Sequence, residues 1–113
     1  MKPFICVDFD GVLNNYKGYE GDNLGTIRPG AREFLQTLSQ DYTVSILSVR
    51  SYHLIIRWLE QYDLLQYVDE VTSIKRAAVA YVDDRGLRFN GNYEEVLEQL
   101  ENFKPYWEEK SDA

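Results

Sequence analysis

The sequence predicts a single α/β domain over residues 1–113, a three-layer α/β/α sandwich built around a mostly parallel β-sheet. Segments of strand-forming apolar residues alternate with segments whose apolar residues recur at helical spacing. The strand segments are apolar along most of their length, which is typical of parallel strands covered on both faces. The chain shows no internal repeat, low-complexity tract or linker that would divide it.

The first strand is predicted at residues 4–8 and leads into a long polar segment. Residues 11–29 contain glycines interleaved with asparagines and aspartates, so we expect a loop or a small flap there. Pro29 then opens a helix, because proline fits the first helical turn. The buried stripe of this helix is expected to consist of Ala31, Phe34, Leu35 and Leu38.

Two more strands and a second helix complete the predicted sheet. Residues 42–48 form the second strand, and Ser51 is expected to cap the helix that follows it. Residues 67–73 and 77–83 are predicted as the third and fourth strands, the last of which ends in acidic residues. The buried face of the second helix is expected to consist of Ile55, Trp58, Leu59 and Tyr62.

A last helix is predicted near the end of the chain. Asn92, with Glu95 three residues later, is typical of a helix start. The helix is expected to run up to Pro105 and to place one apolar face on the core. Trp107 is expected to pack at its end, and residues 108–113 to fray. The apolar face consists of Tyr93, Val96, Leu97, Leu100 and Phe103.

Composition and charge indicate an ordinary globular protein and narrow its partners. Hydrophobic residues make up 44% of the chain, but no apolar run reaches the roughly 20 residues that span a bilayer. The single cysteine fits a reducing compartment and no signal-peptide pattern is present, so we expect a cytoplasmic protein. The net charge of −7 makes general affinity for nucleic acid or anionic membranes unlikely, although it leaves a nucleic-acid substrate open.

Two pairs of acidic residues follow apolar strands. Asp8 and Asp10 share one face, because side chains alternate along a strand. Asp83 and Asp84 end the fourth strand, and in a parallel sheet both pairs emerge at the carboxyl edge, where α/β folds bind ligands. Carboxylates held this close repel unless a proton or a cation lies between them, and a hard divalent cation suits oxygen ligands. Taken alone, the first pair is equally well interpreted as an Asp-Gly turn that ends a strand.

Hydroxyl and cationic side chains fall between the two acid pairs. Ser48 ends the second strand and Lys75 precedes the fourth. A neutral donor and a compact positive charge suit a phosphate dianion. Arg50 adds a guanidinium that can make a forked contact with phosphate oxygens. These residues predict a phosphate site beside the carboxylates.

In this order and on these elements, the residues resemble the four motifs of the haloacid dehalogenase-like superfamily of phosphohydrolases. Asp8–Val12 matches the first motif, Asp-x-Asp-Gly-Val, and Ser48 matches the second. Lys75 matches the third motif, and the pair Asp83 and Asp84 matches the fourth. The resemblance implies a Rossmann-like fold and Mg²⁺-dependent hydrolysis of a phosphomonoester.

The resemblance also implies a role for each acidic residue. Asp8 would attack phosphorus and form an aspartyl-phosphate, and Asp10 would act as general acid and then general base. Mg²⁺ would be held by Asp8, by the main-chain carbonyl of Asp10 and by the fourth-motif pair. Within that pair the alignment favours Asp84 as the direct ligand and Asp83 as an indirect one. Ser48 and Lys75 would hold the phosphate oxygens.

Members of this superfamily often carry a cap domain, which this chain has little room for. Residues 11–29 can form only a small flap, and residues 51–74 are taken up by a helix and a strand. A capless site would either admit a bulky substrate or be covered by another subunit of a homo-oligomer. Tyr16, Lys17 and Tyr19 of the flap are candidate specificity residues, although we favour ordinary surface aromatics for the two tyrosines.

The substrate and the exact reaction stay open. The same intermediate would serve a phosphotransferase, and the fold can also serve a non-catalytic phosphate-binding or regulatory module. Sugar phosphates, nucleotides and phosphorylated ends of nucleic acids or proteins all fit the motifs. Cys6 lies inside the first strand and is expected to be an inert core residue, and His53 is expected to face solvent. Neither supports a zinc site.

Overall fold

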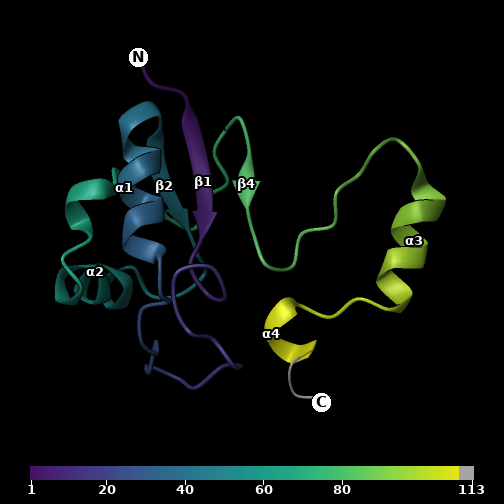
Figure 1. The fold of residues 1–113 in the computed structure, drawn as a ribbon, viewed down its shortest axis with the longest axis horizontal. Coiled ribbons are helices and arrows are strands. Elements are labelled where there is room, and N and C mark those ends of the chain that lie inside the picture. The colour runs from purple at the N-terminus through teal and green to yellow at the C-terminus, as the bar shows by residue number, and fades with distance from the viewer. Residues whose placement is uncertain (110–113) are drawn as a thin grey trace.

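The computed structural model of this chain describes residues 1–109. Within them lies a four-stranded, all-parallel sheet with the strand order β3-β2-β1-β4 (Figure 1). The α/β, Rossmann-like fold class predicted from the sequence is therefore confirmed. The strands are β1 (Phe4–Asp8), β2 (Thr43–Leu47), β3 (Glu70–Thr72) and β4 (Tyr81–Val82).

Two helices connect the first three strands. Helix α1 (Ala31–Asp41) joins β1 to β2, and helix α2 (Tyr52–Gln61) joins β2 to β3. Both connections move the chain in the same direction across the sheet, and because such crossovers are right-handed the two helices cover the same face. Arg32 of α1 donates to the carbonyl oxygens of Tyr62 and Asp63 at the end of α2, which ties the helices together.

The core lies between this face of the sheet and the two helices. Alternate residues of the central strands point into it, because side chains alternate along a strand. Phe9 continues β1 into the core and meets the ring of Trp58 edge to face, with centroids 4.8 Å apart. Burying each such large apolar side chain contributes about 1.5–3 kcal/mol. The fully buried members include Val7, Val44, Ile46, Leu35, Ile55 and Leu59.

The sheet differs from prediction mainly at its edges. The fourth strand was predicted at residues 77–83, but β4 covers only Tyr81–Val82. As an edge strand, β4 pairs with β1 alone, and the preceding residues add single hydrogen bonds, such as the one from the N–H of Val79 to the carbonyl of Phe4.

Ser51 precedes α2 as predicted, but its side chain makes no capping hydrogen bond. A short 3₁₀ helix, η1 (Leu65–Tyr67), was not predicted.

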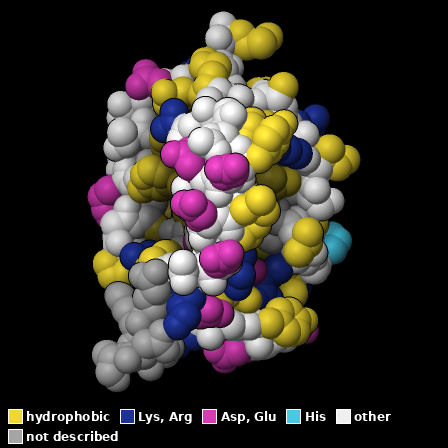
Figure 2. All heavy atoms as spheres, turned by 90° about the vertical axis from the view of Figure 1, so that its right-hand side faces the viewer, with side chains coloured by type: hydrophobic (Ala, Val, Ile, Leu, Met, Phe, Trp, Pro, Cys, Tyr) yellow, Lys and Arg dark blue, Asp and Glu magenta, His cyan; other side chains and the backbone are white. Residues whose placement is uncertain are grey.

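The last predicted helix forms but does not pack on the core. Helix α3 (Tyr93–Glu101) begins as expected at Asn92, whose side-chain oxygen accepts hydrogen bonds from the N–H groups of Glu94 and Glu95. It stands apart from the sheet (Figure 1), and Leu97 on its apolar face is 62% exposed. Figure 2 shows acidic side chains gathered over this helix beside exposed hydrophobic ones. The predicted packing is wrong, because an amphipathic pattern specifies an apolar face and not the surface that this face meets.

The chain after Pro105 folds back toward the sheet. A short helix, α4 (Tyr106–Glu109), occupies residues that were expected to lie at the end of the last helix or to fray. The rest of the predicted frayed segment, residues 110–113, lies outside the described residues. Within residues 1–109, none of the helices has the length and apolar character needed to cross a membrane.

We expect truncation of a core isoleucine to destabilise the fold far more than the same truncation at the surface. Ile55 is fully buried, so Ile55→Ala removes buried methyl groups, leaves a cavity and should lower the free energy of unfolding by about 2–5 kcal/mol. Ile74 is 68% exposed, so Ile74→Ala should change it by no more than about 0.5 kcal/mol. Urea denaturation of both variants measures the difference. Equal losses would contradict the described core.

Candidate functional site

The predicted site residues meet at the carboxyl edge of the sheet because β1 lies between β2 and β4. In the register of the sheet, Asp8 at the end of β1 lies beside Leu47, the last residue of β2. Ser48 therefore follows on one side of Asp8, and Asp83 and Asp84 follow β4 on the other side. Neighbouring parallel strands deliver their end residues to one place, which is why side chains so far apart in sequence converge.

Three carboxylates form the centre of the site. Asp8, Asp83 and Asp84 each offer an oxygen, and these oxygens all lie within 4.8 Å of one another. Burial, a hydrogen bond with Asp84 and the negative charges of Asp83 and Asp84 raise the pKa of the Asp8 carboxyl to about 8, although the N–H of Phe9 acts in the opposite direction. At neutral pH the repulsion among the three carboxylates is thus reduced either by a proton on Asp8 or by a bound cation. A set of carboxylate oxygens fits a hard divalent cation such as Mg²⁺.

The fourth predicted carboxylate, Asp10, is held away from this cluster. Arg50 donates from Nε to its Oδ2 at 2.7 Å, and Asn14 donates from Nδ2 to its Oδ1 at 3.1 Å. Asn14 is buried, and its own oxygen accepts the N–H of Gly11, so it braces the turn that follows β1. The Asp10 carboxylate is therefore oriented by two donors, while the expected metal contact through its main-chain carbonyl stays a prediction.

Arg50 links the flap to the site. Besides its ion pair with Asp10, its Nη1 donates to the carbonyl oxygen of Gly21 in the flap at 2.8 Å. Its side chain is 7% exposed, and its guanidinium lies 5.2 Å from the centroid of the Tyr19 ring. The ion pair with Asp10 and the hydrogen bond to Gly21 turn the guanidinium toward protein groups. Its expected contact with phosphate stays a prediction.

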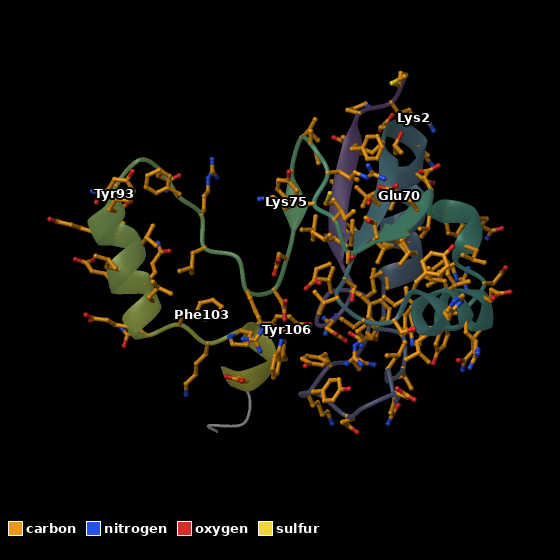
Figure 3. All side chains as sticks on the ribbon, turned by 180° about the vertical axis from the view of Figure 1, so that it is seen from behind. Lys2, Glu70, Lys75, Tyr93, Phe103 and Tyr106 are labelled. Atoms are coloured by element: carbon orange, nitrogen blue, oxygen red, sulfur yellow. The ribbon has the colours of Figure 1, made fainter. Side chains whose placement is uncertain are left out.

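A cavity of about 300 Å³ opens beside Asp8 and joins the carboxylates to the predicted phosphate-binding residues. Ser48 is buried, and its Oγ accepts the N–H of Arg50, which leaves the hydroxyl hydrogen to donate to a ligand. Lys75 lies on the connection that precedes β4 (Figure 3), with its Nζ 4.5 Å from the centroid of the Tyr81 ring. The lining residues include Asp8, Asp10, Ser48, Lys75, Tyr81 and Asp83.

Two residues of the site were missed by sequence reasoning. Trp107 donates from Nε1 to Oδ2 of Asp84 at 2.6 Å, and the hydroxyl of Tyr106 donates to the carbonyl oxygen of Gly11 at 2.5 Å. Figure 3 shows Tyr106 beside the loops at the edge of the sheet, whereas Tyr93 lies at the far end of α3. The available signal was a pair of aromatic residues with polar donors directly after Pro105, outside the predicted helix.

The remaining candidate residues lie in the core, on the surface or beside the site. Cys6 is 1% exposed inside β1, as expected of a core residue, and His53 is exposed. Tyr19 is 77% exposed, as a surface aromatic should be. Tyr16 instead meets the ring of Trp107 edge to face, with centroids 4.9 Å apart, so this flap residue belongs to the surroundings of the site.

Comparison with known proteins supports the fold. The chain matches no protein-family model and no curated protein. Its structure is similar to that of a conserved protein from Bacteroides thetaiotaomicron, with a TM-score of 0.60 and 21% sequence identity over 94% of this chain and 95% of that one. At this identity the likeness shows the shared fold alone.

In metal-free protein, the carboxylate cluster should make stability depend on pH in a definite direction. Unfolded Asp8 loses its proton near its ordinary pKa of 3.8, whereas folded Asp8 keeps it up to about pH 8. The unfolding free energy contributed by this group therefore falls as pH rises between these values. The Asp8→Asn variant has no titrating group at this position. The free energy of unfolding of the variant minus that of the wild type should therefore increase from pH 4 to pH 8 and then level off. Urea denaturation in EDTA measures it, and a constant difference would refute the raised pKa.

Proposed function

We propose that this protein is a Mg²⁺-dependent phosphatase of the haloacid dehalogenase-like type, which hydrolyses a phosphomonoester through an aspartyl-phosphate intermediate. The observation that carries the proposal is the position of Asp8. Asp8 lines one cavity together with Asp83 of the acidic cluster, the hydroxyl-bearing Ser48 and the cationic Lys75. A carboxylate so placed can reach a phosphate that is bound by the other groups.

The acidic cluster supports a cation requirement. Asp8, Asp83 and Asp84 present oxygen ligands only, which is the donor chemistry that Mg²⁺ prefers. When bound, the cation neutralises charge on the phosphoryl oxygens and shields the nucleophile from the anionic substrate. Asp84 is favoured as the direct ligand by the match of the pair to the fourth motif, and its side chain is less exposed than that of Asp83.

The chain's own residues supply the remaining steps. The carboxylate of Asp8 attacks phosphorus as the bond to the leaving oxygen breaks, while Ser48 and Lys75 hold the phosphoryl oxygens. In its protonated form Asp10 gives a proton to the leaving oxygen, and as a carboxylate it then takes one from the water that hydrolyses the intermediate. Arg50 and Asn14 hold the Asp10 carboxylate in position for the second of these transfers.

The setting of the reaction follows from the same residues. The chain's single cysteine is buried inside β1 and needs no oxidising compartment, which supports a cytoplasmic phosphatase. A phosphatase of the capless type would either admit a bulky phosphomonoester to the cavity beside Asp8 or have that cavity covered by a second subunit.

The proposal is tested by phosphate release from an aryl phosphate in the presence of Mg²⁺. Asp8→Asn removes the nucleophile with little change in volume, so we expect a loss of turnover of about 10³-fold or more. Asp41→Asn makes the same change in an exposed acid at the end of α1 and should keep wild-type turnover. EDTA should abolish turnover in both the wild type and the control.

Two outcomes would overturn the proposal. Retention of most activity in Asp8→Asn would remove Asp8 as the nucleophile. Failure of the wild type to release phosphate from aryl phosphates, phosphorylated metabolites and nucleotides alike would favour a non-catalytic phosphate-binding module on the same fold.

Metal titration separates the roles of the two neighbouring acids. We expect Asp84→Asn to weaken Mg²⁺ binding about 10- to 100-fold and Asp83→Asn to weaken it less, because Asp83 is exposed and serves its own turn. Isothermal titration calorimetry with MgCl₂ measures both. The reverse order would exchange their roles.

A further inference from the structure

The segment after Pro105 contacts both acid-bearing loops of the site. The Tyr106 hydroxyl binds the carbonyl of Gly11, which follows the acids of β1, and the Trp107 indole binds Asp84, which follows β4. Two adjacent residues thus connect the ends of two neighbouring strands. Neither contact is needed to close the hydrophobic core, which lies on the face covered by α1 and α2.

Asp84 and the indole of Trp107 meet in the space that Gly11 leaves open. Gly11 has a φ of +84°, and a Cβ built on it would lie 2.3 Å from Oδ2 of Asp84 and 3.1 Å from Nε1 of Trp107. A glycine is therefore required at this position both for its backbone conformation and for space. The absent side chain lets the carboxylate of Asp84 and the indole N–H meet beside the backbone.

The indole itself is held in orientation. The ring of Tyr16 meets Trp107 edge to face at 4.9 Å, and the guanidinium of Arg85 lies 5.2 Å from the indole centroid. A donor fixed in this way constrains the carboxylate that it binds without competing for both of its oxygens. Trp107 uses one acceptor position on Oδ2 of Asp84, and an ionised carboxylate offers about four such positions, so a cation can bind the same group.

We propose that Tyr106 and Trp107 are positioning residues of the cation site, and that the segment carrying them completes the site by orienting Asp84. The inference rests on the proposed Mg²⁺ function. It assigns to this segment a role that the four sequence motifs do not contain, since these motifs end at Asp84. Hydrogen bonds to a ligating carboxylate are charge-assisted, and their loss typically lowers metal affinity 10- to 100-fold.

The first test compares two identical substitutions. Trp107→Phe keeps an aromatic ring against Tyr16 but removes the indole N–H, so the dissociation constant for Mg²⁺ should rise about 10-fold or more in calorimetry with MgCl₂. Trp58→Phe is the matched control, because the N–H of Trp58 donates to the carbonyl of Gly25 in the flap and not to a carboxylate. Its dissociation constant should stay within about twofold of the wild type. Tyr106→Phe, which removes only a hydroxyl, should weaken binding in the same direction.

The second test measures tryptophan emission during a Mg²⁺ titration. If Trp107 served only the stability of the fold, its emission would not respond to Mg²⁺. The chain has two tryptophans, so Trp58→Phe leaves Trp107 as the single emitting indole. Binding of Mg²⁺ to Asp84 alters the charge next to the indole N–H, so the emission should change with the same midpoint as the calorimetric titration. In Trp107→Phe the emission of Trp58 should not respond to Mg²⁺.

The outcomes separate this inference from the proposed function. Mg²⁺ binding by the wild type together with unchanged affinity in Trp107→Phe, or with unchanged emission in Trp58→Phe, would overturn the positioning role alone. If Trp107→Phe does not fold, as judged by circular dichroism, the Tyr106→Phe titration and the emission of Trp58→Phe decide instead. Absence of Mg²⁺ binding by the wild type would overturn the proposed function and this inference together.

Discussion

Repulsion among carboxylates is the constraint on which the rest of this site depends. Two neighbouring parallel strands, β1 and β4, end in acidic residues, so the oxygens of Asp8, Asp83 and Asp84 lie within 4.8 Å of one another. Partial burial strengthens this repulsion, because the surroundings screen charge less well than water does. The raised pKa of Asp8 is its direct consequence. A protein that keeps such an arrangement needs neighbouring groups that make it tolerable.

Those neighbours act in different ways. Arg50 holds the carboxylate of Asp10 in an ion pair, and Asp10 is not among the three acids whose oxygens lie close together. Gly11 gives Asp84 room, and the indole of Trp107 stabilises the charge of Asp84 with a hydrogen bond. The surroundings thus reduce the electrostatic cost of holding Asp8, Asp83 and Asp84 close together beside the cavity.

Sequence patterns predicted the parts of the fold that depend on local periodicity. The strand at residues 4–8, the buried positions Ala31 and Leu35 of α1 and the convergence of Asp8 with the acid pair after β4 all follow from side-chain period and parallel topology. The position of α3 did not follow, because its apolar face carries no information about its partner. The contact of Trp107 with Asp84 was likewise hidden, since it depends on how the chain returns across residues 85–105, whose predicted apolar face does not specify the surface that it meets.

The long return of the chain also has a consequence for folding. The hydrogen bond between Tyr106 and Gly11 joins residues 95 positions apart, and helix α3, which lies between them, buries none of its side chains. Once β4 has joined the sheet, residues 83–105 still have to close a loop, and none of them belongs to the hydrophobic core cluster, so few apolar contacts offset the entropy cost. The sheet and its two helices therefore form a more stable cooperative unit than the segment that carries Tyr106 and Trp107. Amide protons of α4 should exchange with solvent through local opening while those of β1 and β2 stay protected, so the contacts of this segment with Gly11 and Asp84 have their own opening equilibrium.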